Sequence, residues 1–82
     1  MATFIDIHDV PGVKAEAAAD AHAADLRVQG RYGVDYQRYW VDEEAGTLFC
    51  LVEAPDAATA ALVHREAHGL EAQAIHRVRE GA

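Results

Sequence analysis

The order of the segments along the chain is the feature that most constrains its fold. Stretches whose side chains alternate between two faces are typical of β-strands, and stretches with apolar residues every three or four positions are typical of helices. The expected segments are a strand, a helix, two strands, a helix and a strand, at 3–8, 13–32, 34–41, 47–54, 57–68 and 72–78. This βαββαβ order predicts an α+β, ferredoxin-like fold with a four-stranded antiparallel sheet and two helices on one face.

Turn and cap residues stand at the borders between these segments. Gly33 follows the first helix, and a helix commonly ends at a residue in the left-handed conformation. The acidic loop 42–46 closes with Gly46, which supplies the positive φ that a tight hairpin needs. Asp56 is a preferred N-cap residue for the second helix, and Gly69 stands where that helix should stop. The borders therefore support the same βαββαβ order.

One face of the sheet is expected to lack a helical cover. The stripe of the first helix that should face the sheet consists of apolar residues at helical spacing, namely Ala17, Ala21, Ala24 and Val28. In the first strand, Ile5 and Ile7 point to one side and the intervening residues to the other. We expect the uncovered face to expose Phe4, Phe49 and Leu51. An apolar patch of this kind usually belongs to an interface, so the sequence predicts a homodimer.

Size and composition exclude several functional classes. The 82 residues allow one domain, which we place at 1–82. The formal net charge of −7 disfavours nucleic-acid binding, because phosphate contacts need clustered Lys and Arg. No apolar run reaches the length of a membrane span, and the first residues lack the pattern of a signal peptide, so we expect no membrane association. The single cysteine cannot form an internal disulfide, which agrees with a reducing cytoplasm.

Two histidines one helical turn apart are the strongest functional feature. His64 and His68 fall on one side of the second helix with Cβ atoms about 6 Å apart, so one metal ion can lie between two ring nitrogens. The topology brings His22, in the middle of the first helix, and Cys50, in the middle of the third strand, to the height of His64. Asp25 lies three residues after His22, on the same side of its helix. These five residues predict a site for a divalent transition metal.

A second group of polar residues lies in the outer parts of the sheet. Asp6, His8 and Glu53 are expected on the uncovered sheet face or at strand ends. His8 and Glu53 are too far apart to share an ion within one subunit. His8 is therefore a further candidate ligand, in combination with a second subunit or with the acidic loop 42–44. His76, near the C-terminus, is expected at the surface.

The same residues also have structural interpretations. His22 and His64 are alternatively helix-flank residues that hydrogen-bond to Asp25 and Glu66. Cys50 is alternatively a small apolar residue of a half-buried strand. It is also a candidate nucleophile, with His22 or His64 as the base that would activate it. Residue types and spacing leave these alternatives open.

Several short motifs occur together between Phe4 and Leu70. They are Ala21-His22, Asp25-Leu26 with Gln29, Tyr32-Gly33-Val34, Tyr39-Trp40-Val41-Asp42-Glu43, Phe49-Cys50-Leu51-Val52-Glu53-Ala54-Pro55-Asp56, Val63-His64 and Ala67-His68-Gly69. In this combination the chain resembles a family of small bacterial proteins, long catalogued as a domain of unknown function, that includes a nickel-responsive, nickel-binding member. The resemblance implies a ferredoxin-like fold, self-association and nickel as the bound ion. It does not imply which residues ligate the ion.

The leading hypothesis is a cytoplasmic, dimeric, non-enzymatic nickel-binding protein that acts in metal storage, buffering or response. Its candidate ligands are His8, His22, Asp25, Cys50, His64 and His68. These donor types also accept zinc, cobalt or copper. Neutral imidazole is the ligating form, so affinity is expected to fall as the pH drops through about 6.5. The alternatives are a small dimeric α+β barrel enzyme with His22 or His64 as general base, and a plain interaction module.

Overall fold

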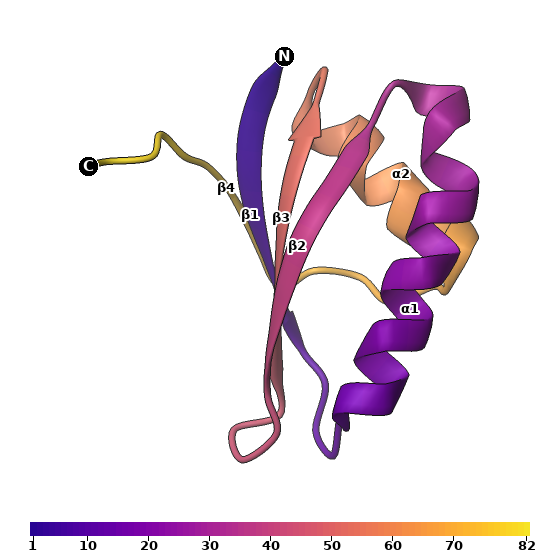
Figure 1. The fold of residues 1–82 in the computed structure, drawn as a ribbon, viewed down its shortest axis with the longest axis vertical. Coiled ribbons are helices and arrows are strands. Elements are labelled where there is room, and N and C mark those ends of the chain that lie inside the picture. The colour runs from indigo at the N-terminus through magenta and orange to yellow at the C-terminus, as the bar shows by residue number, and fades with distance from the viewer.

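The computed structural model describes residues 1–82, and its elements follow the expected order (Figure 1). They are β1 (Ala2–Asp9), α1 (Ala15–Val28), the short 3-10 helix η1 (Gln29–Tyr32), β2 (Asp35–Asp42), β3 (Thr47–Ala54), α2 (Ala57–Ala67) and β4 (Ala74–Arg77). The four strands form one sheet in which every neighbouring pair is antiparallel. The ferredoxin-like fold class predicted from the sequence is confirmed.

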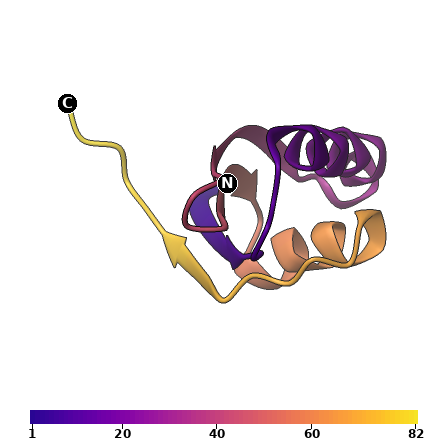
Figure 2. The same ribbon diagram turned by 90° about the horizontal axis from the view of Figure 1, so that it is seen from below.

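The elements form two layers, a sheet and a pair of helices on one of its faces. The strand order β2-β3-β1-β4 places β3 and β1 in the centre. In Figure 2, α1 and α2 lie side by side on the same side of the sheet, and the chain after β4 runs away from them. Neither helix has the length and apolar character needed to cross a membrane. At the middle of the sheet, Asp6 of β1 pairs with Cys50 of β3, and both side chains are buried on the face that the helices cover.

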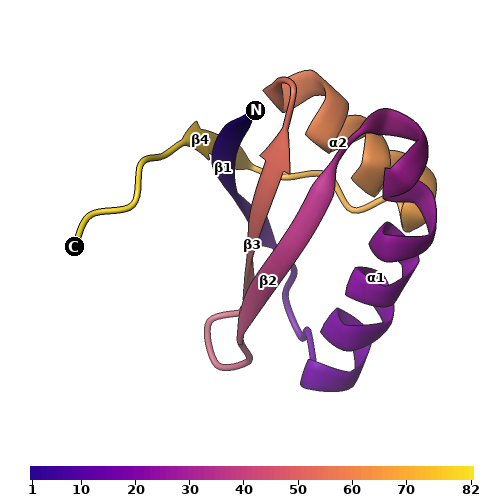
Figure 3. The same cartoon turned by 45° about the horizontal axis from the view of Figure 1, so that its top comes forward.

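The two helices begin in different ways. Oδ1 of Asp56 accepts a hydrogen bond of 2.7 Å from the backbone N–H of Thr59, so the predicted N-cap of α2 is confirmed. The helix α1 begins at Ala15, two residues later than predicted, and its first N–H donates to Oε2 of Glu43 at 2.7 Å. Glu43 lies in the β2–β3 loop, at the same end of the molecule as the start of α1 (Figure 3). A contact distant in sequence therefore helps to fix where α1 starts.

A 3-10 helix, which is wound more tightly than an α-helix, follows directly after α1. The α-helix ends at Val28, and η1 continues the chain to Tyr32, within the segment predicted as one helix. Short 3-10 turns commonly finish α-helices, and Gly30 lies within this one. Gly33 then adopts a left-handed conformation with φ of 65°, so the predicted C-terminal cap is confirmed.

The buried stripe of α1 lies one residue away from the predicted stripe. Ala18 and Asp25 are the buried residues of this helix, whereas Ala17 is exposed. One residue corresponds to a rotation of about 100° around the helix axis. Alanines occur on several sides of α1 and do not distinguish them, and a carboxylate is not expected at the centre of a buried stripe. The predicted stripe was therefore wrong at Ala17, whereas Val28 packs against the core as predicted.

The uncovered sheet face is apolar, but Phe4 is not part of it. Phe4 is 6% exposed and pairs with Val52, and paired residues of antiparallel strands point to the same side of the sheet. Phe4 therefore belongs to the core under the helices, and its predicted exposure was wrong. The large apolar residues of the uncovered face are Ile5, Ile7, Trp40, Phe49 and Leu51; Trp40 is 50% exposed and the others are partly buried.

The hairpin between β2 and β3 requires glycine at position 46. Gly46 has φ of 71°, and an added Cβ would lie 3.0 Å from the Cα of Pro11. The substitution Gly46→Ala is expected to lower the free energy of unfolding by about 2 kcal/mol, measured by urea denaturation. Gly30→Ala is the control, because a Cβ at position 30 meets no atom within 4 Å. Equal stability of the Gly46→Ala variant and the native chain would contradict this prediction.

Candidate metal centre

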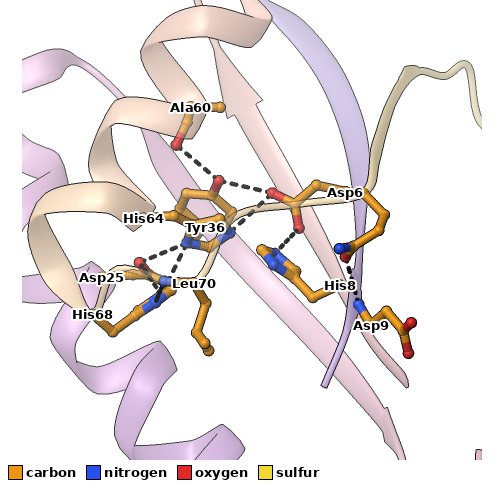
Figure 4. A network of polar contacts seen from close by, with 10 residues as sticks. Asp6, His8, Asp9, Asp25, Tyr36, Ala60, His64, His68 and Leu70 are labelled. Atoms are coloured by element: carbon orange, nitrogen blue, oxygen red, sulfur yellow. Dashed lines mark hydrogen bonds and ion pairs between the residues drawn. The ribbon is translucent and has the colours of Figure 1, made fainter. Parts of the chain in front are cut away.

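Five polar side chains are almost completely buried between the sheet and the helices. Asp6, His8, Asp25, Tyr36 and His64 are each at most 2% exposed. They come from β1, α1, β2 and α2, and Figure 4 shows them pointing toward one another. Buried charged groups are costly unless they are paired, and clusters of them are concentrated at functional sites. This cluster is therefore the strongest candidate for the functional site of the protein.

His64 lies at the centre of the cluster, between two carboxylates. Its Nδ1 is 2.8 Å from Oδ1 of Asp25, and its Nε2 is 2.9 Å from Oδ2 of Asp6. Burial by itself lowers the pKa of His64, but the hydrogen bonds and negative charges of Asp25 and Asp6 raise that pKa to about 9. The ring is therefore an imidazolium near neutral pH in the metal-free protein, and it donates one N–H to each carboxylate.

Both carboxylates are held in the charged form. Burial alone would raise the pKa of Asp6, but hydrogen bonds and charges from His64 and His8 hold that pKa well below its usual range. Burial likewise acts on Asp25, and there His64 and His68 lower the pKa. The core thus contains an Asp–His–Asp arrangement with two negative charges and one positive charge near neutral pH.

Tyr36 and Cys50 surround Asp6. The Tyr36 hydroxyl lies 2.9 Å from Oδ2 of Asp6 and 3.0 Å from the carbonyl oxygen of Ala60, and its single proton can be donated to one of them at a time. Burial and the neighbouring Asp6 charge raise the pKa of Tyr36 and of the Cys50 thiol. Cys50 is therefore a protonated thiol in the metal-free protein. This state argues against a role as a catalytic nucleophile, which requires a depressed pKa.

Asp25, His64 and His68 form a first group of ligand atoms, called here the triad. Oδ1 of Asp25 lies 2.8 Å from Nδ1 of His64 and 3.1 Å from Nε2 of His68, and the two nitrogens are 3.1 Å apart. Metal–ligand bonds of about 2.1 Å at right angles place neighbouring ligand atoms about 3 Å apart. The triad therefore has the spacing of three ligands on one face of an octahedron.

A small void lies against the triad. Its volume is about 10 Å³, and its lining includes all three triad residues together with Cys50. Such a volume is close to the smallest that holds one water-sized occupant. The size of the void and the donor types of the triad both suit a single ion.

The tautomer of His68 is fixed by a backbone contact. The N–H of Leu70 donates to Nδ1 of His68 at 3.1 Å, so a neutral His68 ring carries its proton on Nε2. A metal bond at Nε2 would move this proton to Nδ1, and the Leu70 amide would then have to turn away. Leu70 lies in the connection between α2 and β4, which has no regular structure and can accommodate this change.

A second group of ligand atoms lies deeper in the core. Asp6, His8, Cys50 and His64 offer one ligand atom each, and these four atoms lie within 4.8 Å of one another. All four residues are buried. The sequence-based prediction placed Asp6 and His8 on the uncovered face or at strand ends, and this placement was wrong. The register of β1 against β3 puts both side chains on the helix-covered face, opposite Cys50 and Leu48.

His22 is the candidate ligand that the structure does not bring into either group. Its ring is partly buried and packs against Tyr39, with ring centroids 4.9 Å apart. It borders the small void beside the triad, at the side of α1 next to Asp25. The alternative interpretation of His64 is right in its hydrogen bond to Asp25 but wrong in its position, because His64 is buried and not on the helix flank. Glu66 instead accepts a hydrogen bond from the hydroxyl of Tyr32.

Sequence reasoning missed the role of Asp6 and Tyr36. A usable signal for Asp6 was its position two residues from both Phe4 and His8, which puts all three side chains on one face of the strand. A β-bulge between Tyr36 and Arg38 changes the alternation in β2, so its faces could not be read directly from the sequence.

Comparisons with known proteins agree with the fold and point to a family. Residues 4–78 match the family described as nickel responsive protein SCO4226-like. The crystal structure of SCO4226 from Streptomyces coelicolor A3(2) superimposes with a TM-score of 0.91 and 36% sequence identity. The match covers 99% of this chain and 100% of that one. None of the curated proteins matches. Since the family match spans most of the sequence, the chain belongs to the SCO4226-like family of nickel responsive proteins.

Proposed function

We propose that the protein binds nickel through Asp25, His64 and His68 and acts in nickel storage, buffering or response, without catalysing a reaction. The observation that carries this proposal is the spacing of 2.8 to 3.1 Å among the three ligand atoms of the triad. The void of about 10 Å³ against the triad supports it. When bound, nickel would exert its charge on the buried carboxylates and displace the proton from Nδ1 of His64.

The identity of the ion rests on the family and not on the donor set. Imidazole and carboxylate donors bind nickel well, but two histidines and one carboxylate on one face are also typical of iron(II). Zinc, cobalt and copper are accepted by the same donors. Elemental analysis of protein purified without a polyhistidine tag distinguishes these ions, and nickel is the expected result.

Replacement of His68 tests the triad. The native chain and a His68→Ala variant are titrated calorimetrically with nickel after removal of bound metal. We expect the affinity of the triad to fall at least ~100-fold in the variant, because even residues that only support a ligand contribute ~10-fold or more. His76→Ala is the matched control, since His76 is exposed and belongs to neither ligand group. An unchanged affinity in His68→Ala would remove the triad as the nickel site.

The size of the neighbouring cavity favours ion binding over an enzymatic function. A cavity of about 180 Å³ reaches Asp6 and His64 from the side of α2 and the α2–β4 connection. Sites for organic ligands usually measure ~300 Å³ or more and are mainly apolar. The raised pKa of His64 also means that its ring holds a proton near neutral pH and is a poor general base. The free thiol of Cys50 is compatible with the reducing cytoplasm in which we place the protein.

A second copy of the chain is the proposed partner. The apolar face formed by Ile5, Ile7, Trp40, Phe49 and Leu51 has no helix over it. A hollow of about 620 Å³ on this face is bordered by β1, by Trp40 and Leu51, and by the chain after β4. Faces of this kind usually belong to interfaces, and a small domain gains stability when a partner covers them.

A charge on the uncovered face should separate the proposed dimer. Trp40→Asp is expected to change the molar mass measured by light scattering from that of a dimer to that of a monomer, because a carboxylate at the centre of an interface is not paired there. Leu26→Asp is the control: Leu26 is 49% exposed, close to the 50% of Trp40, but lies on α1. A monomeric native chain, or a Trp40→Asp variant that stays dimeric, would contradict the proposed interface.

A further inference from the structure

The second group of ligand atoms contains a combination of donors that the triad lacks. Asp6, His8, Cys50 and His64 supply carboxylate, imidazole and thiol groups, and each of these residues is at most 4% exposed. Their ligand atoms lie within 4.8 Å of one another. Thiolate together with imidazole selects borderline to soft ions such as nickel, cobalt and zinc over magnesium or calcium. The group therefore matches the same class of ion as the triad.

His8 carries a polar atom without a partner. Its Nε2 is 2.9 Å from Oδ1 of Asp6, but its Nδ1 is buried and has no hydrogen bond. Buried nitrogen atoms are nearly always hydrogen-bonded, and an exception points to a missing partner such as an ion or a rearranged ring. His8 therefore has one ring nitrogen at Asp6 and a second, unpartnered ring nitrogen inside the core.

His64 belongs to both groups. Its Nδ1 faces Asp25 and His68, whereas its Nε2 faces Asp6 on the other side of the ring. One imidazole can bind two ions in this way when both ring nitrogens have lost their protons. The ring is buried on both sides, so each nitrogen meets the ligand atoms of its own group.

Two divalent ions would leave the buried group neutral. Asp6 and Asp25 bring two negative charges, and the thiolate of Cys50 and a doubly deprotonated His64 bring two more. Two divalent cations neutralise these four charges. The protons released from Cys50 and His64 go to solvent, and no electron transfer is involved.

We propose that Asp6, His8 and Cys50 hold a second divalent metal ion and that His64 bridges it to the ion in the triad. The bridging role of His64 rests on the proposed nickel site. The site formed by Asp6, His8 and Cys50 does not depend on it. The cavity of about 180 Å³ that ends at Asp6 and His64 supplies a route from solvent. Glu71 and Arg65 lie on its lining and form an exposed ion pair with a separation of 3.8 Å.

Cobalt(II) is the probe for the second site. Metal-free protein is titrated with cobalt(II), and the native chain is expected to bind two ions and to develop the near-ultraviolet absorption of a cobalt–thiolate bond. The variants Cys50→Ser and Cys50→Ala should lack this absorption, and Cys50→Ala should bind one ion. Circular dichroism verifies that both variants keep the fold. A native chain without the thiolate absorption at saturating cobalt(II), or a Cys50→Ala variant that binds two ions, would overturn the proposal.

Two further measurements separate this proposal from the proposed function. In His68→Ala the thiolate absorption should persist while one ion is lost, so failure of the triad leaves the second site detectable. Two cobalt ions on one imidazole ring are magnetically coupled, so the paramagnetic resonance signal per cobalt should be weaker in the native chain than in Cys50→Ala. Equal signals per cobalt would exclude the His64 bridge.

Discussion

Replacing His64 by phenylalanine is expected to lower the free energy of unfolding of the metal-free protein by about 3 to 5 kcal/mol at pH 7. Phenylalanine keeps a ring against Tyr36 and His8, whose ring centroids lie 4.2 and 4.8 Å from that of His64. It removes the positive charge between Asp6 and Asp25 and leaves both carboxylates buried without their main partner. The effect is large for a chain whose total stability is on the order of 4 to 12 kcal/mol.

Urea denaturation at pH 7 measures this effect, and two further variants identify its cause. His76→Phe changes an exposed histidine and should stay within about 0.5 kcal/mol of the native chain. The double variant His64→Phe/Asp25→Asn should be more stable than His64→Phe alone, because one of the two unpaired charges is gone. A loss below about 1 kcal/mol in His64→Phe would mean that the Asp–His–Asp arrangement contributes little to the fold.

The parts of the fold that could be predicted are those that depend on neighbouring residues. Gly33 and Gly46 have the positive φ expected of them, and Asp56 caps α2 through its own side chain. These outcomes follow from backbone sterics and local hydrogen bonds. The start of α1 could not be predicted, because its first N–H is bound by Glu43 from another loop.

From the sequence, the candidate site could be predicted only for ligands whose spacing is set within one helix. His64 and His68 are one turn apart, and their ring nitrogens are 3.1 Å apart in the structure. Asp6 was missed because its face depends on the register between β1 and β3, and a shift of one residue moves every side chain to the other face. His22 was included because it shares a helix side with Asp25, but the helix is rotated so that Asp25 points into the core.

The same charges that stabilise the metal-free core cause its stability to fall as the pH rises above 6.5. The pKa of His64 is 6.5 in an ordinary environment and about 9 in the folded protein. A pKa raised by folding contributes stability that is complete below pH 6.5 and is lost as the pH rises through 9. The gap between these two pKa values corresponds to roughly 3 kcal/mol.

The buried carboxylates limit the stability of the metal-free protein at low pH. Because folding lowers the pKa of Asp6 and Asp25, their contribution is present above the ordinary carboxylate pKa and is lost as the pH falls below it. Metal-free protein should therefore be most stable between about pH 4 and pH 6.5, and it should lose roughly 3 kcal/mol between pH 6.5 and pH 9 or slightly above. Urea denaturation in the presence of a chelator measures this decline, and His64→Phe should lack it.

Nickel should remove the decline in stability between pH 6.5 and pH 9. In the proposed site nickel and the proton would compete for Nδ1 of His64, so the expected fall in nickel affinity with decreasing pH begins near pH 9 and not near pH 6.5, the ordinary histidine value. At a fixed nickel concentration, the stabilisation by bound ion grows with the ratio of that concentration to the dissociation constant. Because the same proton is involved, this gain offsets the loss in the metal-free protein, so at saturating nickel the free energy of unfolding should stay nearly constant between pH 6.5 and pH 9 while it falls in chelator. A parallel decline in both conditions would mean that the ion does not bind to His64.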